Sequence, residues 1–237
     1  MNIGCIILTN TKDLSKYGMC QRAIHSLLWS EQTMEFNIVV VESNKNALNQ
    51  GFIYDLRTPN ILTVTPDEEF GYNKFLNIGI NMLRVNRSDL PEWVIIANSD
   101  IIFTQHWLTN MLEWQKNNNS ILSMSPWEPN WHTAKGLDKK DGPFIGYRVS
   151  YEITGWCLVI HRDVFSKCGL FDPQFKFWYQ DNDYALTLKK ENIKHALIPS
   201  SRVYHMVSGT HDIIPPEKLH QMTHGQHEIF KRKWNYE

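Results

Sequence analysis

Three positions in the sequence place a carboxylate or an imidazole where it could do chemistry. Asp100 follows the apolar run 93–97, Asp181 lies within the segment 180–183, and His205 follows a short strand-like segment. Carboxylate and imidazole groups bind divalent cations, and a carboxylate in a cleft can also take a proton from a hydroxyl group. The same residue types are common in turns, on surfaces and in the first turn of a helix, so each position taken alone leaves both interpretations open.

The two aspartates of segment 180–183 should have different roles. An apolar pattern predicts a helix from about 180 to 191, and side chains two positions apart on a helix do not face each other. Asp181 is therefore the better candidate to project into a cleft, and Asp183 the better candidate to hold a loop. A carboxylate at a helix N-terminus is expected to stay ionised, with its basicity lowered.

The elements that must position these residues alternate between strand and helix in the first hundred residues. Short apolar runs predict strands at 4–8, 36–41, 61–64 and 93–97, and helical periodicity predicts helices at 14–29 and 75–83. This alternation predicts an α/β fold with a mostly parallel sheet and helices on both faces. Because ligands bind at the carboxyl ends of such strands, Thr9, Glu42 and Asp100 should share one rim.

The second half of the chain is less regular. We expect a helix carrying residues 108–115 with Thr104 as its cap, a long aromatic loop at 125–149, and a strand at 155–160. The tail is polar and rich in histidine. His220 and His224 would share one helix face and could bind zinc, but no glutamate lies between them, and ordinary surface histidines are the favoured interpretation.

Composition narrows the class of protein. The 237 residues include 24 Lys and Arg against 25 Asp and Glu, a net charge of -1 that favours neither nucleic acid nor another strongly charged partner. No apolar run approaches the roughly 20 residues of a membrane span, and the N-terminal residues lack a signal peptide's basic region. The four cysteines form no CxxC pair. We therefore expect one domain, no transmembrane segment and reduced thiols in a cytoplasmic protein.

Several segments in combination resemble the family 2 glycosyltransferases, in their rhamnosyltransferase-like branch. The likeness covers residues 3 to about 208. It rests on Ile38-Val39-Val40-Val41-Glu42, Phe70-Gly71-Tyr72-Asn73, Ala97-Asn98-Ser99-Asp100, Gly155-Trp156-Cys157-Leu158, Gly169-Leu170-Phe171-Asp172-Pro173 and Phe177-Trp178-Tyr179-Gln180-Asp181-Asn182-Asp183. The resemblance implies a single GT-A domain over residues 1–237. Residues 1–100 would hold a nucleotide-diphospho-sugar donor, 101–208 the acceptor and the catalytic group, and 209–237 a tail.

The resemblance also implies a metal site and a donor site. Asp100 matches the last aspartate of a DxD-type motif that holds Mn²⁺ or Mg²⁺ on the donor diphosphate, and Asn98 replaces the first aspartate. His205 would complete the metal site, and its imidazole suits manganese. Donor contacts are further implied at Thr9, Glu42 and Asn77.

Asp181 matches the family's general base, and Gln180 stands where the family usually has glutamate. Trp127, Trp156, Trp178 and Gln180 are the candidates for contacts to the acceptor or the sugar. With no second nucleophile in the pattern, we expect inversion at the anomeric carbon. The acceptor could be a glycan precursor or a hydroxylated base in viral DNA. Because of Asn98 and Gln180, a noncatalytic sugar or nucleotide binding module is the alternative of another class. The sequence leaves the nucleotide, the sugar and the oligomeric state open.

Overall fold

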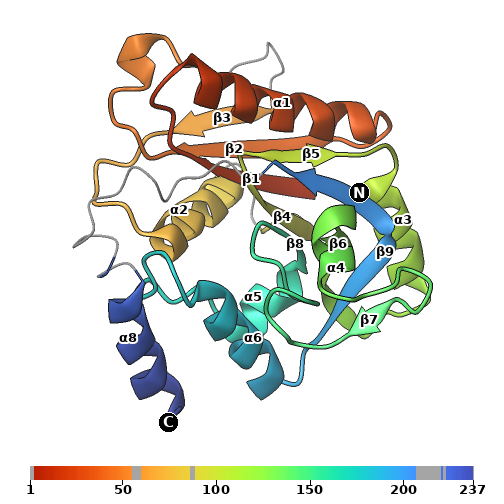
Figure 1. The fold of residues 1–237 in the computed structure, drawn as a ribbon. Helices are drawn as coiled ribbons and strands as arrows, with labels where there is room; N and C mark the ends of the chain where they lie inside the picture. The colour runs from red at the N-terminus through yellow and green to blue at the C-terminus, as the bar shows by residue number, and fades with distance from the viewer. Residues whose placement is uncertain (1–2, 55–59, 86–88, 207–219, 221–222, 237) are drawn as a thin grey trace.

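The computed structural model describes residues 3–54, 60–85, 89–206, 220 and 223–236. Within these residues nine strands form one sheet, in the order β3-β2-β1-β4-β8-β6-β9-β5, with β7 paired to β9 (Figure 1). The strands are β1 (Ile3–Thr9), β2 (Phe36–Glu42), β3 (Ile61–Val64), β4 (Trp93–Asn98), β5 (Ile101–Phe103), β6 (Ile121–Trp127), β7 (Phe144–Ile145), β8 (Cys157–His161) and β9 (Lys194–His205).

Strand direction divides the sheet into two parts. Strands β1 to β4 are mutually parallel, as the alternation of strands and helices predicts. Strand β8 lies antiparallel to both β4 and β6, while β6 and β9 are parallel. The short strands β5 and β7 both pair antiparallel to β9. The sheet is therefore mixed, because hydrophobic periodicity carries no information about the direction of a strand.

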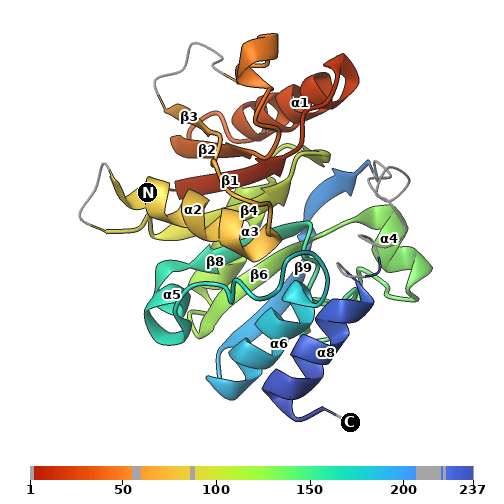
Figure 2. The same cartoon turned by 90° about the vertical axis from the view of Figure 1, so that its left-hand side faces the viewer.

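Helices cover both faces of this sheet, as Figures 1 and 2 show. They are α1 (Leu14–Ser30), α2 (Tyr72–Val85), α3 (Trp107–Lys116), α4 (Pro129–Ala134), α5 (Arg162–Cys168), α6 (Gln180–Lys190) and α8 (His224–Trp234), with a short 3-10 helix at Leu48–Gln50. Among the described helices, none is both long and apolar enough to cross a bilayer.

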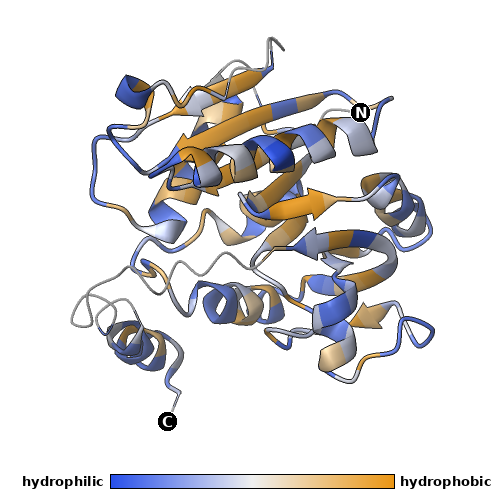
Figure 3. Cartoon of the chain, turned by 45° about the horizontal axis from the view of Figure 1, so that its top comes forward, coloured by the Kyte–Doolittle hydropathy of each residue, from blue (hydrophilic) through white to orange (hydrophobic). Residues whose placement is uncertain are grey.

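Two hydrophobic cores result from the alternation of side chains along each strand. Ile3, Cys5 and Ile7 of β1 face α1 and α3, whereas Ile6 and Leu8 face α2. The second core also holds apolar residues of α5 and α6. In Figure 3 the strands are largely hydrophobic and the helices are two-sided, as this arrangement requires. The sheet is thus a rigid support whose strand ends can hold a site.

Asp13 caps α1, with Asp13 Oδ1 accepting from the backbone N–H of Lys16. Two local expectations differ from the structure. Helix α3 begins at Trp107 rather than near Thr104, and the buried carboxylate of Glu31 accepts hydrogen bonds from the first turn of α3. Residues 121–127 form strand β6 inside the sheet, so the irregular segment after it is shorter than predicted.

Candidate active site

The ends of β1, β2 and β4 form one rim, as predicted. Thr9 and Glu42 are register partners, and Leu8 pairs with Asn98. The Glu42 side chain is buried: its Oε1 atom lies 3.1 Å from the backbone nitrogen of Thr11 and 2.7 Å from that of Asn44. Glu42 therefore fixes the two loops that follow β1 and β2, which sets the shape of the rim.

Hydroxyl groups gather beside Glu42. The Oγ1 atoms of Thr9 and Thr11 lie 3.4 Å apart, and the Thr11 hydroxyl is hydrogen-bonded to the Tyr54 hydroxyl. All three side chains are buried, and burial raises the pKa of Tyr54. These groups are neutral hydrogen-bonding partners at the rim.

Asn77 is placed differently from the other donor-site candidates. Its side-chain amide donates to the Phe171 carbonyl oxygen at 2.7 Å and accepts from the Phe171 backbone N–H at 3.1 Å. Both ends of the amide therefore connect α2 to the turn that precedes α6. Its predicted donor contact has no support in this geometry, although Asn77 does help to position the turn.

The structure brings Asp100 and His205 together. Strands β5 and β9 pair Ile101 with His205, and His205 Nε2 lies 3.2 Å from Asp100 Oδ1. Both side chains are largely buried, and the His205 ring stacks on the Trp156 ring at a centroid distance of 5.4 Å. One carboxylate oxygen and one imidazole nitrogen fit a divalent cation whose other ligands are phosphate oxygens and water.

A cleft of about 640 Å³ lies beside this pair. Its walls come from the end of β4, from the turn before β8 and from the start of α6. It is lined by Tyr72, Asn98, Val149, Ser150, Gly155, Trp156, Phe177, Trp178, Tyr179, Gln180, Asp181 and Asn182. Five of the residues predicted for the site therefore share this cleft: Asn98, Trp156, Trp178, Gln180 and Asp181.

Asp181 provides the cleft with an unusual carboxylate. Burial raises its pKa to about 6, and a hydrogen bond from the Gly155 backbone opposes that rise. The expectation that the helix N-terminus lowers the basicity of Asp181 is therefore wrong in direction, because the loss of solvent outweighs the helix dipole. A carboxylate with such a pKa is ionised at neutral pH and is a stronger base than an exposed aspartate.

Sequence reasoning missed Tyr72 as a site residue. Its hydroxyl lies 3.2 Å from Asn98 Oδ1 and 3.2 Å from the Gly155 carbonyl oxygen, so it can donate to either acceptor. Burial raises its pKa, and the charges of Asp181 and Asp100 add to the rise. Tyr72 thus lies between the Asp100–His205 pair and Asp181. In the sequence, Tyr72 is marked only by its place in Phe70-Gly71-Tyr72-Asn73, one of the segments that resemble the glycosyltransferase family.

The tryptophans separate into two groups. Trp178 is 43 % exposed and lines the cleft, and Trp156 lines the cleft beside His205. Trp127 is only 3 % exposed, and its ring stacks with those of His132 and Phe144. A sugar cannot reach Trp127 in this structure, contrary to the expected contact, because strand β6 carries the residue into the sheet.

Gln180 has an unused hydrogen-bonding atom. Within the described part of the chain, Gln180 Oε1 and Asn73 Oδ1 are buried without a hydrogen-bond partner. Both residues line a small cavity behind Asp181. Gln180 therefore has a buried acceptor atom without a partner, at the position where the resembled family usually has glutamate.

The described histidines of the tail, His220, His224 and His227, belong to no recognisable metal centre. The rings of His220 and His224 lie 5.0 Å apart, but across the described ranges no group of three or more His, Cys, Asp or Glu side chains could hold a metal ion. His211 lies outside the described residues.

Comparisons with known proteins identify the fold and leave the family open. No family model matches the sequence, and no curated protein matches it. The structure is similar to that of GalNAc-T7 in complex with UDP, GalNAc and Mn²⁺, with a TM-score of 0.66 and 16 % identity over 86 % of this chain and 44 % of that one. It is also similar to the mannosyltransferase PcManGT from Pyrobaculum calidifontis in complex with GDP-Man and Mn²⁺.

For the mannosyltransferase the TM-score is 0.63 and the identity 14 %, over 88 % of this chain and 58 % of that one. This chain therefore spans about half the length of both solved proteins. The chain has the GT-A fold, the class of α/β fold that its sheet and helices define. Membership of family 2 and of its rhamnosyltransferase-like branch stays a prediction.

Proposed function

We propose that the protein is a glycosyltransferase that moves a sugar from a nucleotide-diphospho-sugar to an acceptor hydroxyl group. The observation that carries this proposal is the position of Asp181. Its carboxylate lies in the 640 Å³ cleft with a pKa of about 6, and the ring of Trp156, which lines that cleft, stacks on His205 of the Asp100–His205 pair. A base in a cleft and a candidate metal pair next to the wall of that cleft are what sugar transfer from a diphosphate requires.

The donor would bind along the rim formed by β1, β2 and β4. Thr9 and the loops that Glu42 fixes would border the nucleoside, and Asn98 would border the diphosphate or the sugar. Both structural neighbours were solved with a nucleotide or nucleotide-sugar and Mn²⁺, which supports a donor of this class.

Asp100 and His205 would hold the divalent cation, either Mn²⁺ or Mg²⁺. Bound there, such a cation would offset the negative charge that develops on the leaving nucleoside diphosphate. The imidazole ligand favours manganese, since magnesium prefers an all-oxygen set. In this arrangement Asn98 adds no negative charge to the site.

Asp181 would take the proton from the acceptor hydroxyl as the bond to the anomeric carbon forms. Asp181 is the only carboxylate among the described residues that line the cleft, so there is no second carboxylate to form a covalent sugar intermediate. Direct displacement by the acceptor inverts the anomeric carbon. We therefore propose an inverting reaction.

The acceptor would enter beside Trp156, Trp178 and Gln180. The two indole rings offer apolar surfaces for a sugar ring, and Gln180 also lines this part of the cleft. No lysine or arginine is found among the described residues that line the cleft. A glycan acceptor is therefore favoured over a hydroxylated base in DNA, whose phosphates would call for positive charge.

A panel of nucleotide sugars tests the proposal. With Mn²⁺ present, we expect one donor to be hydrolysed slowly without acceptor and faster with a suitable glycan. Asp181→Ala should lower turnover by about 10²–10⁴-fold while donor binding is retained. The control is Asp138→Ala, which removes an exposed carboxylate that does not line the cleft. Tight donor binding without turnover for any donor would instead identify a noncatalytic binding module, and full turnover in Asp181→Ala would remove Asp181 from its role.

A further inference from the structure

Helix α8, near the C-terminus, packs against the segment that carries Asp181. In Figures 1 and 2 it lies beside α6 on the side away from β1 and β2. None of the residues predicted for the site belongs to α8, and no α8 residue lines the 640 Å³ cleft. Its contacts nevertheless fall on the residues that precede and begin α6.

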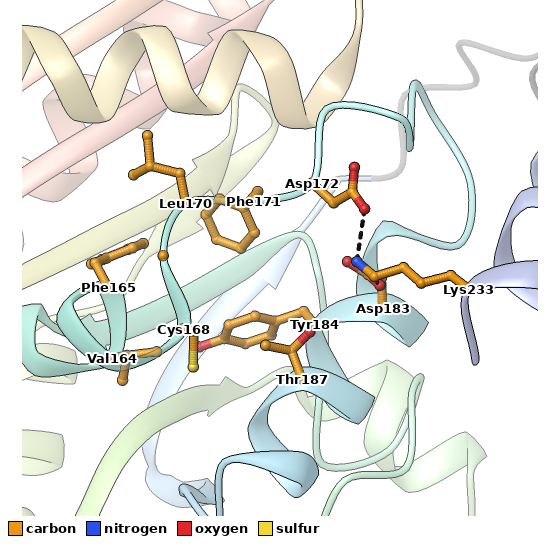
Figure 4. A pocket seen from close by; sticks show the side chains of 11 residues that line it. Val164, Phe165, Cys168, Leu170, Phe171, Asp172, Asp183, Tyr184, Thr187 and Lys233 are labelled. Carbon is orange, nitrogen blue, oxygen red and sulfur yellow. Dashed lines mark hydrogen bonds and ion pairs between the residues drawn. The ribbon is translucent and has the colours of Figure 1, made fainter.

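The first group of contacts is polar and centres on Lys233. Its Nζ atom lies 2.8 Å from Asp172 Oδ2 and 2.7 Å from Asp183 Oδ1, so one cation joins the turn before α6 to the first turn of α6. Figure 4 shows Lys233 reaching between these two carboxylates. The neighbouring Trp234 indole N–H donates to Asp183 Oδ1 at 2.8 Å. Asp183 is buried, so the cation of Lys233 and the hydrogen bond from Trp234 compensate for the loss of water around its carboxylate.

The second group of contacts is aromatic and centres on Tyr179. The Tyr179 ring stacks on His227 at a centroid distance of 5.1 Å and packs against Phe230 at 5.2 Å. Next to His227 on α8, Gln226 Oε1 accepts a hydrogen bond from the backbone N–H of Lys176, three residues before Tyr179, at 2.7 Å. Helix α8 therefore contacts the segment 176–183 at three separate places.

This segment needs external support because of its backbone. Tyr179 has a φ of 64°, a left-handed conformation that costs a residue with a side chain roughly 1 kcal/mol. Tyr179 stands at the N-cap of α6 and makes no side-chain capping bond. Such a conformation persists when its surroundings hold it in place. The stacking partners His227 and Phe230 provide that support.

The consequence for the cleft follows from helical geometry. Asp181 and Asp183 lie two positions apart in the first turn of α6, so their side chains point in different directions. The Gly155 backbone hydrogen-bonds Asp181 on one side, and Lys233 and Trp234 bind Asp183 on the other. Movement of one side of this short turn necessarily moves the other.

We propose that α8 is a positioning element of the active site: Lys233 and Trp234, acting through Asp183, and His227, acting through Tyr179, hold the start of α6 so that the Asp181 carboxylate stays in the cleft. The proposal deepens the proposed function, since it assumes that Asp181 is the base. Lys233 is a positioning residue and touches neither donor nor acceptor.

The test compares Lys233→Met with Arg232→Met, which removes an exposed cation at the next position of the same helix. In Lys233→Met we expect kcat to fall about 10-fold or more, with the donor KM within about twofold of wild type, because the donor rim lies on β1, β2 and β4. Amide hydrogen exchange over residues 176–183 should become at least about 10-fold faster. Arg232→Met should change neither quantity, and Lys233→Arg should restore both.

Two further measurements allow the proposal to be tested even if Lys233→Met does not fold or the protein transfers no sugar. If Lys233→Met does not fold, His227→Ala removes only the stacking on Tyr179 and should produce the same faster exchange and lower kcat. If the wild-type protein transfers no sugar, the proposed function fails, and two other measurements then decide the positioning role. These are amide hydrogen exchange over residues 176–183 and the pKa of Asp181. In the variants this pKa should fall from about 6, because the Asp181 carboxylate gains solvent. Unchanged exchange over 176–183, or faster exchange with a wild-type kcat, overturns the proposal.

Discussion

The Asp181 carboxylate lies against the backbone at Gly155, where only a glycine leaves room for it. A β-carbon added at position 155 would lie 2.1 Å from Asp181 Oδ1 and 2.4 Å from its carboxyl carbon. Real side chains never approach so closely, so any residue larger than glycine must displace Asp181 or the turn before β8. This contact explains why a glycine precedes Trp156 at the wall of the cleft, and it makes the position of the proposed base testable.

Gly155→Ala should remove most activity and leave the fold intact. The added methyl group displaces the carboxylate from its hydrogen bond, and a displacement of about 1 Å can cost about 100-fold in rate. The measurement is kcat together with thermal unfolding. Gly18→Ala on α1 is the matched control, because its β-carbon would meet nothing within 4 Å and should stabilise the helix by up to about 1 kcal/mol. Equal activity in the two variants would contradict the placement of Asp181.

The rate of transfer should rise with pH through about 6, as Asp181 loses its proton. Burial raises this pKa above its usual 3.8, so the ionised carboxylate disfavours the folded state. Relative to wild type, Asp181→Asn should therefore gain stability as pH rises from about 4 to about 6, and the gain of roughly 3 kcal/mol should persist at higher pH. Below pH 4 the two proteins should unfold alike. A pH-independent difference in unfolding free energy would argue against a buried, ionised carboxylate at this position.

Tyr72→Phe should lower kcat/KM about 10-fold, because the hydroxyl that joins Asn98 to Gly155 is lost. The change should also cost about 1 kcal/mol of stability. Tyr147→Phe makes the same chemical change where the hydroxyl donates to the Ile193 carbonyl at 2.9 Å. This control should lose similar stability and no activity. If both variants keep full activity, Tyr72 has only a structural role.

Asp100→Asn should weaken the binding of Mn²⁺ by about 10-fold or more, measured by titration of the metal with the nucleoside diphosphate present. A neutral amide lacks the charge that draws the cation to the site. The control is Asp163→Asn, because Asp163 also faces a histidine, with Oδ2 3.5 Å from His161 Nδ1, but lies away from the cleft. Metal dependence that does not differ between the two variants would place the metal elsewhere.

Glu31→Ala should destabilise the protein by about 1–3 kcal/mol without lowering kcat. The buried Glu31 carboxylate accepts hydrogen bonds from the backbone N–H groups of Leu108 and Thr109, at 2.7 and 2.9 Å, and caps α3 from a distant part of the chain. Glu113→Ala, which removes an exposed carboxylate from the same helix, should change the free energy of unfolding by less than about 0.5 kcal/mol. A small effect in both variants would show that the cap contributes little.

Much of the framework could be predicted from the sequence. The strands at 36–42 and 93–98 and the helix at 14–30 are clear because continuous apolar runs and helical periodicity reflect burial directly. The common rim of Thr9, Glu42 and Asp100 follows from the parallel pairing of β1 with its two neighbours, as local patterning predicts. Strand β6 was missed because Ser123, Ser125 and Pro126 interrupt its apolar pattern, although all three lie inside the fold.

The arrangement and burial of the candidate site residues could be determined only from the tertiary structure. The amino-acid sequence determined which groups are available: one aspartate after β4, one at the start of α6, and one histidine at the end of β9. Only the folded chain decided that Asp100 and His205 meet across the antiparallel pair β5 and β9, that Trp127 is buried, and that Tyr72 lies between Asp100 and Asp181. Strand direction, solvent exclusion and long-range contacts decide these properties, and each depends on residues far apart in the chain. The raised pKa of Asp181 also depends on a long-range contact, because the turn before β8, which contains Gly155, packs against the Asp181 carboxylate and excludes solvent from it.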